Sequence, residues 1–208
     1  MRGIFVRPAS HVTSELVLDT DEVKFVNDWT DDGRYLVYVS SNSTTKQDLW
    51  ILPLSGDPTP QIYLRTPANE MQARVSPDGR WAAYTSDESG RHEVYVDSFP
   101  TPGMKVTISN GGGAQPQWRG DGRELFYLAA DGSIVAVPFR PGTTLRVGQS
   151  QSLFRFALPS SLSDDRNLYA VSSDGRRFLV VSLEDREARE PITMLANWTA
   201  LLARPALP

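Results

Sequence analysis

The stretch that decides the fold is Ala73-Arg74-Val75-Ser76-Pro77-Asp78-Gly79-Arg80-Trp81-Ala82-Ala83-Tyr84-Thr85-Ser86. An apolar run lies on each side of its Asp-Gly pair. Asp-Gly favours a tight turn because glycine accepts positive φ and aspartate can bond to its own backbone. The same pattern returns around Asp32, Asp121 and Asp174, so the four Asp-Gly-Arg anchors are 46, 43 and 53 residues apart. Self-similarity at this period is typical of β-propellers, whose four-stranded blades repeat every ~40–45 residues.

Each repeat contains further strands after this hairpin. Third strands are predicted at Asp48–Pro53, Glu93–Asp97, Ser133–Pro138 and Pro191–Leu195. Looser fourth strands are predicted at Gln61–Leu64, Lys105–Ser109 and Ser152–Phe156, and the long connection at 140–151 has room for an extra short strand. One such meander is too thin to bury its own apolar faces, so the units must stack face to face. The sequence therefore predicts an all-β fold, a partial β-propeller of about four antiparallel four-stranded blades plus an N-terminal half-blade.

The expected boundaries follow from the anchors. Residues 1–20 are predicted to form the second half of a truncated blade, because Gly3–Pro8 matches the third-strand pattern and Glu15–Asp19 has the pattern of a fourth strand. The four blades are predicted at about 21–66, 67–110, 111–157 and 158–200, followed by a C-terminal tail at 201–208. We expect the chain to be a piece of a larger protein. Incomplete blades leave unpaired strand edges, which favour self-association or pairing with another chain.

The repeat form x-Ser-Pro-Asp-Gly-Arg-x-apolar-apolar-Tyr, followed by a strand such as Glu93-Val94-Tyr95-Val96, resembles the WD-like propeller repeat of the TolB-like group. The segments Asp48–Leu54, Gly79–Val96, Gly111–Trp118 and Ile192–Trp198 also resemble the C-terminal propeller of large bacterial serine/threonine protein kinases, which lies beyond a membrane-spanning segment. This resemblance implies a non-catalytic interaction or sensor module, the C-terminal part of a larger bacterial signalling or envelope protein, in an extracytoplasmic or periplasmic location. The alternative is the accessory gating propeller of a prolyl-oligopeptidase-type hydrolase.

The amino-acid composition limits the kinds of molecule that this chain is expected to bind. The 208 residues carry a net charge of −4 with dispersed basic residues, so no global field attracts nucleic acid. The absence of cysteine excludes disulfides and zinc–thiolate sites. No stretch approaches the ~20 apolar residues of a transmembrane helix, and the first residues are too short an apolar segment for a signal peptide. We expect a protein or peptide partner, no nucleic acid and no membrane insertion of this segment. The residues themselves leave the compartment unknown.

The sequence contains few residues that could indicate a catalytic site. The two histidines, His11 and His92, fall in different kinds of position, whereas a Ser–His–acid triad needs a serine on an exposed turn within reach of a histidine. No Gly-x-Ser-x-Gly elbow and no kinase signature is present. The clustered carboxylates lack the spacing of an EF-hand calcium loop. We therefore expect no enzyme activity, no cofactor and no metal.

The central channel is the surface that the sequence offers for binding. In a propeller the innermost strand of each blade lines this channel, and here it should be the strand before each anchor. Its polar residues are Asn27, Asp28, Gln72, Arg74, Gln115, Gln117 and Asn167. An amide-rich ring with one arginine and one aspartate could bind a peptide carboxylate, a glycan or another small ligand, or simply hold water. Trp29 and Trp118 are instead predicted in the core between blades, where such a side chain contributes on the order of 1.5–3 kcal/mol.

Overall fold

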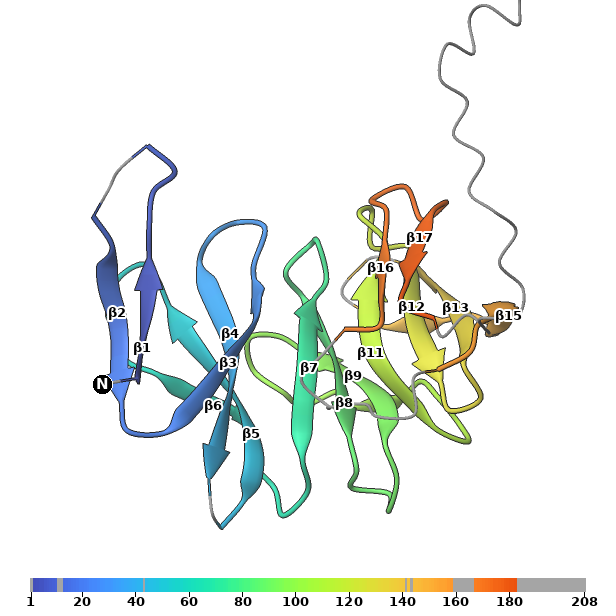
Figure 1. Ribbon diagram of the computed structural model, residues 1–208, viewed down its shortest axis with the longest axis horizontal. Helices are drawn as coiled ribbons and strands as arrows, with labels where there is room; N and C mark the ends of the chain where they lie inside the picture. Colours follow the sequence, from blue (N-terminus) through green and yellow to red (C-terminus); the bar gives the residue numbers. More distant parts are fainter. Residues whose placement is uncertain are drawn as a thin grey trace, which may run out of the picture.

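The computed structural model describes residues 2–10, 13–42, 44–140, 142, 144–158 and 167–182. These residues form antiparallel β-sheets joined by turns and loops, which confirms the all-β prediction. The sheets follow one another in chain order, from β1–β2 at one end to β16–β17 at the other (Figure 1). Within the described ranges, no helix is long and apolar enough to cross a membrane.

The strands group into two short sheets at the ends and three blades between them. The first sheet pairs β1 (Arg2–Val6) with β2 (Glu15–Thr20). The first blade contains β3 (Val23–Trp29), β4 (Tyr35–Asn42), β5 (Lys46–Pro53) and β6 (Gln61–Leu64). The second contains β7 (Glu70–Val75), β8 (Trp81–Ser86), β9 (Glu93–Ser98) and β10 (Val106–Thr107). The third contains β11 (Gly113–Trp118), β12 (Glu124–Ala129), β13 (Ser133–Arg140), β14 (Arg146–Val147) and β15 (Gln151–Arg155). The last sheet pairs β16 (Tyr169–Val171) with β17 (Phe178–Val180).

The partial-propeller prediction holds for these sheets. The strand predicted at Gln61–Leu64 has those bounds, and the extra strand expected in the long connection is β14, which pairs with the end of β13. The strand predicted at Pro191–Leu195, the tail at 201–208 and His11 lie outside the described residues. What the structure describes of the fourth blade is therefore its first two strands.

The anchor turns explain why the repeat folds as it does. At Asp78, carboxylate Oδ1 accepts hydrogen bonds from Ser76 Oγ (2.6 Å) and from Arg80 N (3.3 Å), and Gly79 has a φ of 69°. The turns at Asp32 and Asp174 have the same arrangement, with a hydroxyl two residues before the aspartate. Each repeat therefore encodes its own hairpin locally, because the aspartate supplies the acceptor and the glycine the left-handed conformation.

One apolar cluster fills each seam between neighbouring sheets. The seam between the first and second blades buries residues such as Leu49, Met71 and Tyr84, and the next seam buries Trp81 and Leu125 with their neighbours. A third cluster lies between the third blade and β16–β17, and a fourth between β1–β2 and the first blade. Blade-on-blade stacking is thus the source of the core, as the thinness of each meander predicts.

Candidate functional site

The strands before the anchors lie at the inner edge of their sheets. β3, β7 and β11 are each the terminal strand of a blade, and β7 contacts both β3 and β11. Each of the three carries a register shift that bends the strand. At two of these shifts Gln72 and Gln115 adopt a φ of 57°, a left-handed conformation that is uncommon for residues other than glycine. Such bulges re-aim side chains, and here they turn the polar side chains toward the neighbouring blade.

Most of the predicted site residues bond across the seams. Between the first two blades, Ala73 N donates to Asn27 Oδ1 (2.9 Å) and Val75 N donates to Asp28 Oδ2 (2.7 Å). Gln72 Oε1 accepts from Gln115 N at 2.9 Å in the next seam. The side-chain oxygens of these residues therefore serve as acceptors for the backbone of the following blade.

The same arrangement continues toward β16. Gln115 Oε1 accepts from Leu168 N (2.7 Å), and Gln117 Oε1 accepts from Val171 N (3.3 Å). Gln117 Nε2 also donates to Tyr169 O at 2.7 Å. Through their side-chain oxygens, five of the seven predicted residues thus form a ladder between inner strands, and Arg74 Nη1 adds a further bond across the first seam to Asn27 O. The sequence identified them as channel residues but did not predict this structural role.

Asp28 combines burial with several bonds. Its Oδ1 accepts from Trp29 N at 3.0 Å, in addition to the bond from Val75 N. Burial raises the pKa of the Asp28 carboxyl, although those backbone bonds and the positive charge of Arg74 act in the opposite direction. Asp28 is therefore a linking residue between blades, with Arg74 as the nearby charge of opposite sign.

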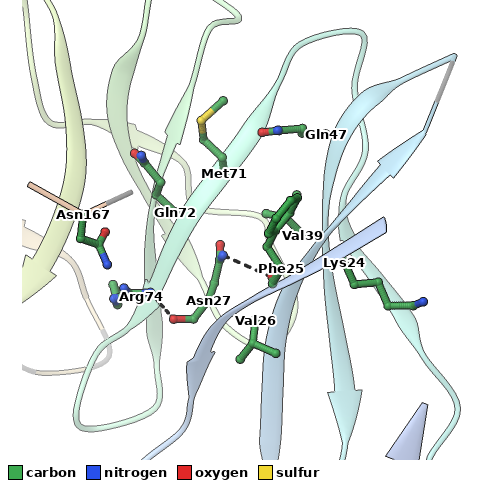
Figure 2. Close-up of a pocket in the computed structure, with 10 residues that line it drawn as sticks. All are labelled: Lys24, Phe25, Val26, Asn27, Val39, Gln47, Met71, Gln72, Arg74 and Asn167. Atoms are coloured by element: carbon green, nitrogen blue, oxygen red, sulfur yellow. Dashed lines mark hydrogen bonds between the residues drawn. The ribbon is translucent and has the colours of Figure 1, made fainter. Parts of the chain in front are cut away.

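Arg74 is one of two predicted residues that line the same two cavities at the channel, and Asn167 is the other. Arg74 Nη1 donates to Asn27 O (Figure 2) and to Ala73 O, and these bonds hold the guanidinium at the channel. The guanidinium lies beside a cavity of about 300 Å³ and a second one of about 400 Å³. Asn167 lines both cavities with it. A third hollow at the anchor-turn end of the channel also includes Arg74 and Asp28.

The first cavity contains residues that the sequence did not single out. Figure 2 shows Phe25, Met71, Gln47 and Lys24 around the same space as Arg74. Lys24 lies on an inner strand, so the rule used for the other polar residues would have found it. The same rule would not have found Gln47, because Gln47 lies on the third strand of its blade, β5, where it pairs with Ser41 of β4. Within the described residues, no three histidine, cysteine or carboxylate side chains group as metal ligands would.

The two tryptophans have different surroundings. Trp118 packs against Phe139 with ring centroids 5.0 Å apart, and its Nε1 donates to Arg74 O at 3.0 Å. The core prediction is therefore confirmed for Trp118. It is wrong for Trp29, which is 50% exposed. Trp118 is covered by the preceding blade, whereas β1–β2 supplies only the outer part of a blade in front of Trp29.

No protein-family model and no curated protein matches this chain. Solved structures match it in fold. TolB from Acinetobacter baumannii superposes with a TM-score of 0.60 at 19% identity, over 84% of this chain and 41% of that chain. A TolB homologue from Agrobacterium tumefaciens gives 0.59 at 16% identity, over 74% and 57% of the two chains. A prolyl endopeptidase gives 0.50 at 13% identity, over 86% of this chain and 30% of that chain. These likenesses show a TolB-like β-propeller fold.

Proposed function

We propose that this chain is a non-catalytic β-propeller module that binds a protein or peptide partner at its channel. We further propose that it belongs to a larger bacterial signalling or envelope protein of the serine/threonine kinase-associated kind. The observation that carries the binding proposal is the position of Arg74, which lines two cavities of about 300 and 400 Å³. Cavities of this size are in the range that small ligands and side chains occupy.

The chemistry of Arg74 favours a carboxylate. Nη1 bonds to backbone oxygens of Asn27 and Ala73, while Nε and Nη2 make no hydrogen bond to any described residue. A guanidinium presents its donors as a planar fork that matches a carboxylate, and such charge-assisted bonds are strong. The apolar side chains of Phe25 and Met71 in the same cavity suit the body of a peptide. The ligand class that fits best is therefore a peptide with a free carboxylate.

The larger parent protein is supported by sequence resemblance and by length. The Asp-Gly-Arg repeats resemble those of TolB-like and kinase-associated propellers, and this chain spans 41% and 57% of the two TolB chains on which it superposes. A gating propeller of a prolyl-oligopeptidase-type hydrolase is the second candidate, and its support is the shared fold with a prolyl endopeptidase. Sequencing the gene on both sides of this segment would separate these parents, because a kinase domain supports the first and an α/β-hydrolase domain the second.

The binding proposal is tested with peptides and one matched pair of variants. Peptides selected from a display library would be resynthesised with a free C-terminal carboxylate and with a C-terminal amide, and their affinities measured by calorimetry. Because hydrogen bonds to charged groups contribute about 1.5–3 kcal/mol, Arg74→Ala should weaken binding of the acid form by about tenfold or more. Arg80→Ala, on an exposed anchor turn, is the control and should bind as the wild type does. Equal binding of acid and amide, or full binding by a folded Arg74→Ala variant, would contradict the proposal.

A further inference from the structure

One side of β3 lacks the covering that its counterparts in the other blades have. On β7, the side chains in the seam toward the first blade are Met71, Ala73 and Val75, and each is at most 9% exposed. On β3, Val26 and Trp29 are 56% and 50% exposed. The inner strands β7 and β11 have no large hydrophobic side chain of comparable exposure. The uncovered apolar surface is therefore specific to the inner strand of the first blade.

Strand pairing shows which way Val26 and Trp29 point. Val26 pairs with Tyr38 and Trp29 pairs with Leu36, and directly paired residues share one face of a sheet. Tyr38 and Leu36 belong to the apolar cluster that the first blade shares with β1–β2. Val26 and Trp29 therefore face the same side as that cluster, but β1–β2 covers only the outer part of this face.

The free edge of β1 indicates which kind of segment would cover Val26 and Trp29. β1 and β2 have the third- and fourth-strand pattern, and they pair with each other as β5 and β6 do. In the complete blades the other edge of the third strand is occupied by the second strand, as β4 occupies that of β5. Among the described strands, none pairs with that edge of β1. The space beside β1 and in front of Trp29 thus corresponds to the first two strands of a blade, its inner hairpin.

The seam in front of Trp118 shows what contacts such a hairpin would make. Trp118 and Trp29 both lie three residues before their anchor aspartates, and both pair with a leucine at the second position of the following strand. Trp118 Nε1 donates to a backbone oxygen of the preceding inner strand, Arg74 O. Gln72 of the same strand accepts from Gln115 N. Trp29 Nε1, by contrast, bonds to no described residue. A hairpin that resembles β7–β8 would supply the backbone oxygen for Trp29 and a side-chain acceptor for β3.

We propose that the open side of β3, together with the free edge of β1, binds the inner β-hairpin of a further propeller blade that carries an amide or carboxylate side chain on its first strand. The last hairpin of the described residues, β16–β17, does not have this chemistry. β16 is preceded by Leu168 and contains Ala170, at the positions where Gln115 and Gln117 lie before the third anchor. The occupant is therefore a different segment from a second copy's β16–β17. This surface adjoins the channel, because Val26 and Trp29 each line a hollow that also includes Arg74.

The test uses a cyclised synthetic hairpin with the sequence of residues 70–86 as the probe. It should bind the full chain with saturation, and it should slow amide hydrogen exchange in residues 2–6 and 23–29. Trp29→Ala should weaken binding at least tenfold, while Ile62→Ala, at another exposed apolar position on β6, should leave it unchanged. A hairpin with Gln72→Ala, and one with the sequence of residues 167–182, should both bind more weakly.

Four results would overturn the proposal. The first is no saturable binding of the 70–86 hairpin, and the second is equal affinity for the wild type and a folded Trp29→Ala variant. The third comes from sedimentation equilibrium: self-association of the chain that Trp29→Ala abolishes would make a second copy the occupant. Protection confined to residues outside β1 and β3 would likewise place the hairpin elsewhere.

Discussion

Replacing Gln115 by alanine should loosen the seam between the third blade and β16–β17. Gln115 is buried, and its Oε1 accepts the hydrogen bond from Leu168 N at 2.7 Å. Leu168 is also buried, so its N–H gains no water when the amide is removed. A buried donor left without a partner costs about 1–3 kcal/mol, which is the loss we expect for Gln115→Ala.

Two further variants separate the side-chain bond from the backbone conformation. The φ of Gln115 is 57°, and alanine meets the same left-handed strain as glutamine there. Gln115→Gly also removes the amide, but it relieves that strain, so it should be less destabilising than Gln115→Ala by about 1 kcal/mol. Gln115→Glu keeps an acceptor oxygen and should protect Leu168 N better than either.

Amide hydrogen exchange at the seam is the decisive measurement. A loss of 1–3 kcal/mol corresponds to exchange at Leu168 that is about 5- to 150-fold faster, if local opening controls exchange. Amides in β4, two seams away in the first blade, should exchange as in the wild type. Unchanged exchange at Leu168, or a uniform acceleration across all blades, would refute the view that this side chain links neighbouring inner strands.

Two other predictions concern a buried carboxyl and an anchor glycine. Burial raises the pKa of Glu70, so the folded state binds this proton more tightly than the unfolded state, and stability should fall as the pH rises from about 4.3 through the raised pKa. Glu70→Gln should reduce this dependence of the unfolding free energy on pH, measured by urea titrations between pH 4 and 8. An unchanged pH dependence would contradict the role given to Glu70. Gly175→Ala should lower the melting temperature more than Gly56→Ala. Both glycines have positive φ, but an added Cβ would lie 3.2 Å from Phe126 Cζ at Gly175 and would meet no atom within 4 Å at Gly56. Equal shifts in melting temperature would contradict this packing cost.

The tertiary structure gives the predicted channel residues a different role from the one expected from the sequence. Composition and spacing placed Asn27, Gln72 and Gln115 on inner strands, which is where they lie. The left-handed conformation of the two glutamines and the register shifts beside them direct their oxygens to the next blade. No sequence signal marks these shifts, because each depends on how the strand must bend against a neighbour. Arg74 and Asn167 were predicted in the same group, and the tertiary structure sets these two apart because both of them line the same two cavities.

The sequence by itself determined the strands, the anchor turns and the propeller class. These features are local, because an aspartate acceptor and a positive-φ glycine determine each anchor turn, with a hydroxyl two residues earlier at three of the four anchors. The repetition of that hairpin then determines the stacking. Only the tertiary structure decided which of two similar tryptophans is covered. Trp118 and Trp29 occupy the same position in their repeats, yet one is packed against Phe139 and the other is half exposed. The reason is physical: burial of an inner-strand side chain depends on the blade in front of it, and that blade lies at a different place in the chain.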